Sequence, residues 1–355
     1  MSWYVLDVLD RTVERTRRCL FEPFDFWKWM KLAIIVLLIG GSGFNGGSGS
    51  NYSYDASERG PFQGIPAGVT GPFQGIYDVF SANALAIIAG LVLLFILLIL
   101  LFSYISSVME FVFVESLVKN DVRFWEYSRR YLGKGFGLFL FRLLIGLFML
   151  AIVAVVALLF LYPYITGYNV SNFPASNIFL ILMLIFAIAL VFLVFGGLVN
   201  SFISLSIPVA LYTNNNIFRA FSMVLRKFRQ DAGQIVLYWA GRIMLGIAAA
   251  IVVGILALIV IVATVLIVLV VDGLIYLLIT SLLPGSPLVW IVLAPLIFVQ
   301  FILFILALAF VSVPAQVFLR YHLITFLQAW YPEITIPVFD RLEGTGKEDA
   351  LQSIS

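Results

Sequence analysis

Long, uninterrupted apolar runs constrain the fold of this chain more than any other feature of its sequence. The runs at residues 84–102, 136–161 and 247–271 contain a single charged side chain, Arg142. A helix needs ~20 apolar residues to cross a bilayer, and these runs have about that length or more. Hydrophobic residues make up 63% of the chain and charged residues 11%, whereas soluble domains have roughly 45–50% and about 25%. The sequence therefore excludes a soluble globular fold and predicts a polytopic membrane protein.

Six apolar segments, bounded by Gly, Pro, Asn or charged residues, predict an all-α, polytopic transmembrane helix bundle. The predicted spans are 27–44, 82–110, 136–162, 178–210, 234–271 and 288–319. The first is the weakest, because Lys28 and Lys31 leave a short apolar stretch that would also suit a re-entrant segment or a signal-peptide core. The predicted domains are an amphipathic interfacial helix at 1–26, a membrane domain at 27–320 with a Gly/Ser-rich external loop at 45–81, and a cytoplasmic tail at 321–355.

The distribution of basic residues predicts the orientation of the spans. If the N-terminus, the loops at 111–135 and 211–233 and the C-terminus share one side, Arg59 alone of the 21 Lys and Arg residues lies on the other side. Basic residues favour cytoplasmic loops, so both termini are predicted to be cytoplasmic. An even number of spans follows, which requires the first segment to cross.

Internal similarity predicts that the bundle is built from three related hairpins joined by amphipathic cytoplasmic elements. The clearest shared pattern is an Arg, three apolar residues and a Gly near the start of two spans. Duplicated helical units are a common way to build membrane proteins. The matching segments are 120–122 with 215–217, 142–146 with 242–246, and 206–208 with 312–314.

The first twenty residues are predicted to form an interfacial helix. Leu9, Val13 and Leu20 recur at helical spacing on one face, while Asp10 and Glu14 fall on the other. This amphipathic pattern is expected of a helix that lies along a membrane surface or against the cytoplasmic ends of other helices.

Ionisable residues within or near the spans are the candidates for function, because a charge at the bilayer centre costs about 2.5–3.5 kcal/mol on insertion scales. Glu110, Glu115, Arg142 and Arg242 are in this position. The second, fourth and sixth spans also become polar towards the cytoplasm, which predicts a vestibule where the two arginines counter Glu110 or bind an anionic headgroup. The predicted ligand- or lipid-binding residues are Glu110, Arg142, Arg242, Ser103, Ser107, Asn200, Ser204 and Gln316.

A structural interpretation of the same residues stays open. Arg142 and Arg242 lie about where the positive-inside rule places side chains that reach the interface from within a span. Serine and asparagine in spans often form hydrogen bonds between helices rather than line a pathway.

Composition argues against metal, redox and cofactor chemistry. His322 and Cys19 are the only residues of their types, and metal and disulfide sites need two to four such ligands at close spacing. No cofactor or metal is therefore expected. The basic loops fit anionic lipid headgroups better than nucleic acid. Membrane lipids are the predicted partners, with a membrane protein as a further candidate.

A family resemblance is carried by the order of several short motifs. These are the amphipathic helix, Thr16-Arg17, Pro23-Phe24, Gly40-Gly41 and the basic aromatic loop that leads into residues 139–144. In this order the chain resembles an uncharacterised archaeal family of six-helix integral membrane proteins, itself similar in pattern to the membrane domain of some glycerophosphodiester phosphodiesterases. The resemblance implies the bundle and a plasma-membrane setting, and it carries no catalytic residues. The phosphodiesterase barrel itself would need ~250 residues, so it is not part of this chain.

The sequence favours a non-enzymatic role. The leading hypothesis is an envelope scaffold or accessory protein that binds lipid or a membrane partner, because basic amphipathic elements occur without a dense polar pathway. The alternative is a small transporter or channel with a cytoplasm-facing polar vestibule around Glu110. A third possibility is an intramembrane enzyme acting on lipid, which would need paired carboxylates or a histidine in one cavity.

Overall fold

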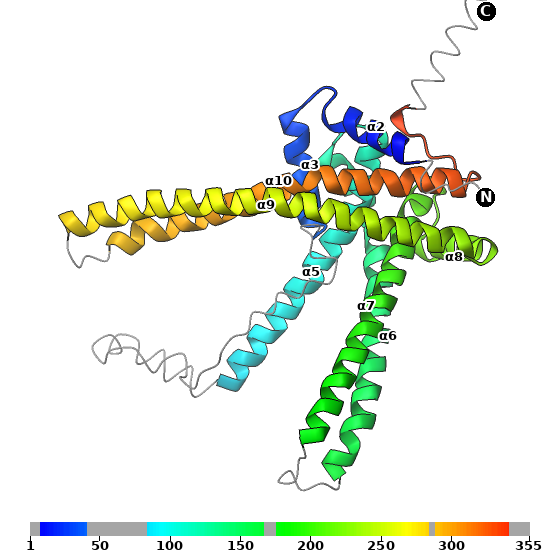
Figure 1. Cartoon of the computed structure of the whole chain (residues 1–355), viewed down its shortest axis with the longest axis horizontal. Coiled ribbons are helices and arrows are strands. Elements are labelled where there is room, and N and C mark those ends of the chain that lie inside the picture. The colour runs from blue at the N-terminus through cyan, green and yellow to red at the C-terminus, as the bar shows by residue number, and fades with distance from the viewer. Residues whose placement is uncertain (1–7, 41–83, 167–174, 284–287, 341–355) are drawn as a thin grey trace, which may run out of the picture. The chain divides into compact units, whose positions relative to one another are not determined.

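A computed structural model describes residues 8–40, 84–166, 175–283 and 288–340 (Figure 1). Within these ranges the chain is helical and contains no strand. The helices are α2 (Leu9–Leu20), α3 (Phe26–Leu38), α5 (Ala84–Lys119), α6 (Phe124–Thr166), α7 (Ala175–Tyr212), α8 (Ile217–Gln230), α9 (Ala232–Leu282) and α10 (Leu288–Trp330). The predicted all-α fold class is confirmed for this part of the chain.

The chain divides into two compact units. One is Gly46–Tyr104, and the other combines Met1–Asn45 with Ile105–Ser355. The described part of the smaller unit is the first portion of α5, where Leu93 and Phe95 are 66% and 65% exposed. The larger unit holds the remaining helices and the later portion of α5, and it contains the packed core.

Among the described residues, five helices are long and apolar enough to cross a membrane. Each coincides with one of the last five predicted spans, and the candidates are Ala86–Lys119, Phe124–Val156, Ile188–Tyr212, Ala232–Leu282 and Val289–Trp330. The first predicted span begins on α3, which has 13 residues. A helix of that length extends about 20 Å, whereas the hydrocarbon core is about 30 Å thick. Residues 41–44 of that span lie outside the described residues, so a sixth crossing stays a prediction.

All five long helices continue past the predicted ends of their spans, and α9 and α10 extend furthest beyond them. Helix α9 runs through Asp272 to Leu282, and Asp272 Oδ1 accepts a 2.9 Å hydrogen bond from Gln300 Nε2 on α10. The carboxylate therefore has a polar partner within the hairpin, and it does not end the helix. Helix α10 likewise continues through residue 321, the start of the predicted tail, to Trp330.

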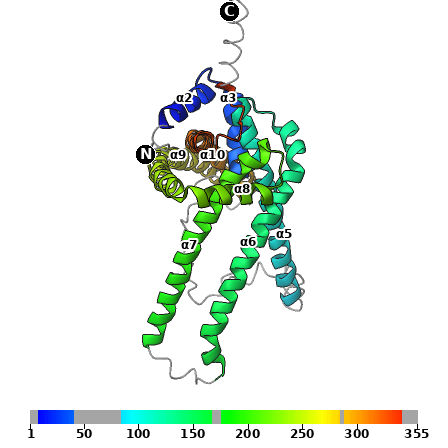
Figure 2. The same ribbon diagram turned by 90° about the vertical axis from the view of Figure 1, so that its right-hand side faces the viewer.

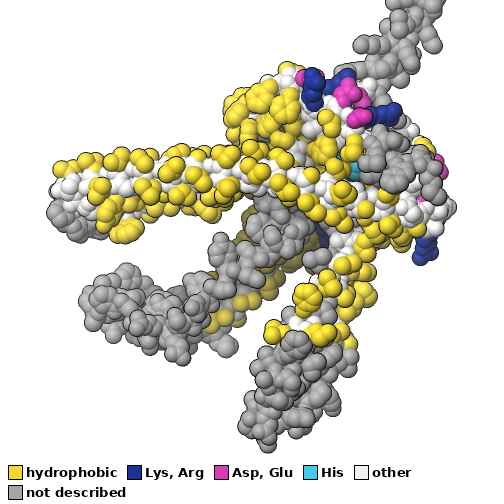
Figure 3. Space-filling view, viewed as in Figure 1, with side chains coloured by type: hydrophobic (Ala, Val, Ile, Leu, Met, Phe, Trp, Pro, Cys, Tyr) yellow, Lys and Arg dark blue, Asp and Glu magenta, His cyan; other side chains and the backbone are white. Residues whose placement is uncertain are grey.

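Buried side chains concentrate on short stretches of the long helices. Residues 107–118 of α5, 201–210 of α7 and 321–327 of α10 are buried throughout. By contrast, α9 exposes large apolar side chains such as Leu258 (61%) and Leu269 (67%). Figure 3 shows apolar side chains along the α9–α10 hairpin, and charged ones in the region of α2. A continuous apolar surface of this kind suits contact with lipid tails.

Helix α2 packs on α10 through a face that matches the predicted one only in part, since Leu20 is fully buried as expected. Val13 is 54% exposed, whereas Thr12, Arg15 and Cys19 are buried. The expected apolar face is therefore wrong at Val13, because the buried guanidinium of Arg15 finds polar partners in the protein. Helix α2 contacts α10, in agreement with one of the two placements expected for this helix (Figure 2).

The junctions that follow α5 and α7 share a backbone feature. Asn120 (φ 56°) and Asn214 (φ 52°) both adopt the left-handed conformation just after α5 and α7. Asparagine tolerates this region better than most residues. Val122 and Ile217, which the sequence comparison aligned, are 4% and 3% exposed. The next elements differ, since α6 runs unbroken into its apolar part whereas α8 ends before α9 begins.

Gly135 allows a close approach of α6 to α5. A Cβ atom at this position would lie 2.8 Å from Val108 Cα. We expect Gly135→Ala to destabilise the fold by about 1–3 kcal/mol because the backbones must separate, as measured by unfolding with sodium dodecyl sulfate in mixed micelles. Gly133→Ala is the matched control, since it makes the same helix substitution with nothing within 4 Å of the new Cβ. Equal stabilities of the two variants would contradict the close approach.

Candidate functional site

Glu110 forms a buried ion-pair centre that joins three helices. It lies in the buried stretch of α5 and is 4% exposed. Arg142 of α6 donates a hydrogen bond from Nη2 to Glu110 Oε1. Arg320 of α10 places Nη2 3.6 Å from Glu110 Oε2, and its side chain is 12% exposed. Each carboxylate oxygen thus faces one guanidinium.

Arg242 lies beside this centre without pairing to Glu110. Its Nη1 atom donates a 2.6 Å hydrogen bond to the hydroxyl of Tyr238, one turn earlier on α9. Tyr238 is fully buried and stacks on Phe326 of α10, with ring centroids 4.2 Å apart. Tyr238 also stacks on His322 of α10, with ring centroids 5.9 Å apart, so Arg242, one turn after Tyr238, packs against the same stretch of α10 that carries Arg320. We call Arg142, Arg242, Arg320 and Glu110 the arginine cluster.

The arginine cluster carries an excess of positive charge. Arginine stays protonated in proteins, so three guanidinium groups face one carboxylate. Among the described residues, Glu110 is the acidic side chain that pairs with this group. A partly buried site with an unbalanced charge favours a bound anion, because charges act more strongly on one another where water is scarce.

Arg142 also lines a groove between α6 and α7. This groove has a volume of about 310 Å³, and its polar side chains are Arg142 and Asn200. Met149 of α6 and Phe192 of α7 line it further along the two helices. The groove is therefore polar near the arginine cluster and apolar away from it. This is the polarity of a lipid, which joins a charged headgroup to an apolar tail.

Two glycines keep this groove open. Gly146 and Gly196 both line it, and a Cβ atom added at either would meet nothing within 4 Å. A larger side chain at these positions would project into free space instead of into the backbone. The groove can therefore be filled by substitution without a clash in the fold.

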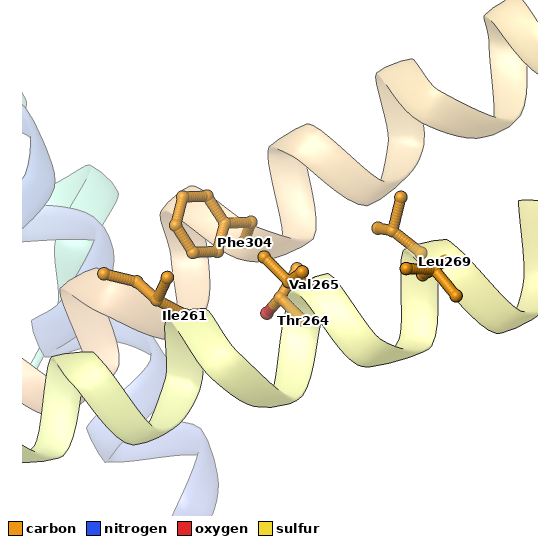
Figure 4. Close-up of a pocket in the computed structure, with 6 residues that line it drawn as sticks. Ile261, Thr264, Val265, Leu269 and Phe304 are labelled. Carbon is orange, nitrogen blue, oxygen red and sulfur yellow. The ribbon is translucent and has the colours of Figure 1, made fainter.

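A second groove lies between α9 and α10 (Figure 4). Its volume is about 300 Å³, and it is lined by Ile261, Thr264, Val265, Val268, Leu269 and Phe304. No charged residue belongs to this lining, so the groove offers no cation to an anionic headgroup. The α6–α7 groove, by contrast, includes Arg142.

The structure brings some of the predicted site residues together and separates others. Glu110 and Arg142 are in contact, and Asn200 shares the α6–α7 groove with Arg142. Ser107 and Ser204 are buried at 0% and 6% exposure on α5 and α7. The other predicted residues are Ser103, which belongs to the smaller unit, and Gln316, which is half-buried on α10 one turn before Arg320.

Sequence reasoning missed Arg320 as a site residue. The sequence pattern places it only among the basic residues at the cytoplasmic ends of spans. The signal that could have identified it is its position four residues after Gln316, on the same face of one helix. Its pairing with Glu110 depends on how α10 packs against α5, which spacing along the chain does not specify.

Glu115 forms a separate polar network between α5 and α7. The hydroxyl of Tyr212 donates a 3.0 Å hydrogen bond to Glu115 Oε2, and Lys119 Nζ lies 2.6 Å from Oε1. Lys134 of α6 donates to the carbonyl oxygen of Ala210 at 3.0 Å, near the end of α7. A cation at that end stabilises the unpaired helix carbonyls. This network therefore has a structural role.

Within the described ranges, no group of three His, Cys, Asp or Glu side chains is placed to hold a metal ion. Cys19 is a buried free thiol on α2. The groups in the described site that can bind a ligand are the guanidinium groups of the arginine cluster and the amide of Asn200.

These features define an all-helical protein in which four helices of membrane-spanning length, α5, α6, α9 and α10, contribute residues to a buried basic cluster. The chain belongs to a family of unknown function (DUF7544), whose sequence profile matches residues 3–336. No curated protein and no solved structure matches the chain. The expected membership of an uncharacterised family is confirmed.

Proposed function

We propose that this protein is an integral membrane protein that binds an anionic lipid and serves as a scaffold or accessory protein of the cell envelope. The observation that carries the proposal is Arg142, which belongs both to the arginine cluster and to the lining of the α6–α7 groove. In this proposal the six spans form three hairpins in the plasma membrane, with both termini in the cytoplasm. The role is non-enzymatic.

The headgroup is placed at Arg142 and Asn200, and an acyl chain follows the groove towards Met149 and Phe192. A lipid tail that enters the groove leaves one apolar environment for another, so tail contacts add little net affinity. Selectivity then comes from charge-assisted hydrogen bonds between guanidinium and headgroup oxygens, which are stronger than neutral ones.

Filling the groove is expected to remove the lipid. Gly146→Leu places a branched side chain in the α6–α7 groove, and we expect retention of a co-purifying anionic lipid to fall by about tenfold or more. Native mass spectrometry of the detergent-purified full chain measures the bound fraction. Gly196→Leu fills the same groove from the facing helix and should have the same effect.

Gly254→Leu is the matched control for these variants. Gly254 lies on α9, is exposed and would have nothing within 4 Å of an added Cβ atom, and it does not line the groove. The control should retain lipid like the unmodified protein. Equal retention in all of these variants would overturn the proposed site.

The alternative of a small transporter or channel uses the same acidic residue. It predicts that reconstituted protein catalyses a flux that Glu110→Gln abolishes, whereas lipid retention would be unaffected by Gly146→Leu. The resemblance to archaeal six-helix proteins and to the membrane domain of glycerophosphodiester phosphodiesterases stays a prediction from the sequence.

A further inference from the structure

The charge of the arginine cluster restricts the kind of anion that it would hold. Three guanidinium groups and one carboxylate leave two positive charges in excess. An anion with one negative charge would balance half of this excess. A dianion would balance all of it.

The arrangement of hydrogen-bond donors further restricts the kind of anion that the arginine cluster would bind. Arg142 and Arg320 each direct one Nη atom to Glu110, so Glu110 fixes the two side chains relative to one another. Each guanidinium has five N–H donors in a planar fork, and donors therefore remain beyond those used on Glu110. Tyr238 accepts from Arg242 Nη1 and holds that side chain beside the pair.

A phosphate monoester has the matching chemistry. Its terminal group offers three acceptor oxygens and carries about −1.5 to −2 charges at pH 7, whereas a phosphate diester such as that of phosphatidylglycerol carries one. Resting on the proposed lipid site, we infer that the arginine cluster selects a terminal phosphate monoester, as in phosphatidate, over a phosphodiester headgroup. Arg242 then supplies the selectivity, because it is the one guanidinium of the three that does not pair with Glu110.

The test compares defined probes on the full-length protein in detergent at pH 8. Native mass spectrometry measures retention of dioleoylphosphatidate and of dioleoylphosphatidylglycerol, each alone and with excess inorganic phosphate. We expect phosphatidate to be retained about tenfold more tightly. Arg242→Gln should bring the two lipids to about equal retention, since one guanidinium charge is lost while the Glu110 pairs remain. Arg123→Gln is the control, because Arg123 is exposed and pairs with Asp121 outside the site; it should keep the preference.

Each outcome separates this inference from the proposal on which it rests. Equal retention of both lipids, with loss of both in Gly146→Leu, would overturn the monoester selectivity and leave the lipid site intact. Retention of neither lipid above a neutral phosphatidylcholine control would overturn both. A further outcome is that inorganic phosphate competes with phosphatidate in the unmodified protein and fails to compete in Arg242→Gln. That result would support a dianion site and identify free phosphate as the ligand.

Discussion

Glu110→Gln is expected to lower the free energy of unfolding by about 3–5 kcal/mol, the usual cost of removing one partner from a buried ion pair. The carboxylate side chain is 5% exposed, and its loss leaves the guanidinium groups of Arg142 and Arg320 facing one another without a counter-charge. The stability is measured in mixed micelles by titration with sodium dodecyl sulfate.

Asp121→Asn is the control for this substitution. It removes the carboxylate from an exposed pair with Arg123, in which the arginine and aspartate side chains are 59% and 51% exposed. Exposed pairs contribute about 0–1 kcal/mol, so the control should be nearly neutral. Arg320→Gln in the Glu110→Gln background should recover part of the lost stability, because one repelling charge is removed. A Glu110→Gln variant as stable as the Asp121→Asn control would contradict the ion-pair centre.

Arg15→Ala is expected to cost about 2–3 kcal/mol, the range for a hydrogen bond to a charged group that is lost from a buried site. Arg15 Nε lies 2.8 Å from Asp340 Oδ2, and Nη1 donates to Thr325 Oγ1 at 2.8 Å and to Gln328 Oε1 at 3.0 Å. This one side chain therefore joins α2, α10 and the segment that follows α10. The unfolding measurement in mixed micelles detects its loss.

Limited proteolysis gives a second measurement for Arg15→Ala. The segment after α10 is held by a hydrogen bond from Gln328 Nε2 to the carbonyl oxygen of Ile336 and by burial of Ile336 and Val338. Without Arg15, cleavage within 331–340 should become faster. Arg17→Ala is the control, since Arg17 pairs with Glu22 at the surface with 71% of its side chain exposed. Identical cleavage rates in both variants would show that Arg15 does not hold this segment.

The long apolar runs made most of the fold predictable. A run of about 20 apolar residues can satisfy its backbone hydrogen bonds in an apolar setting only as a helix or a closed barrel, and five of the predicted spans coincide with long apolar helices. The internal repeat aligned Val122 with Ile217, and both are buried. The left-handed asparagine of the second junction is Asn214, however, one residue before the Asn215 that the repeat aligned with Asn120.

The helix ends were less predictable, because a charged residue in a sequence does not reveal its partner. Asp272 suggested the end of a span, yet Gln300 donates to it from the neighbouring helix and α9 continues. No partner for Arg15 could be read from the sequence, yet Asp340 binds it from a segment more than three hundred residues away in the chain. Such long-range pairs depend on packing, which local periodicity does not encode.

The candidate site was also predictable only in part, because contacts between helices depend on packing. The apolar surroundings of Glu110 and Arg142 marked both residues as exceptional, and they are in contact. The sequence offered Arg142 and Arg242 as equivalent by their shared pattern, but only Arg142 contacts Glu110. Arg320 takes the second position on the carboxylate, which depends on how α10 packs against α5.

The most direct test of the lipid site is photocrosslinking in reconstituted vesicles, using an anionic lipid with a diazirine in its acyl chain and peptide mapping by mass spectrometry. Our account predicts that adducts concentrate on the α6–α7 groove, at Met149, Phe192 and Phe195, and decrease in Gly146→Leu. Adducts that concentrate on the α9–α10 groove around Val265 and Phe304, or that are spread evenly over all exposed apolar helices, would contradict it.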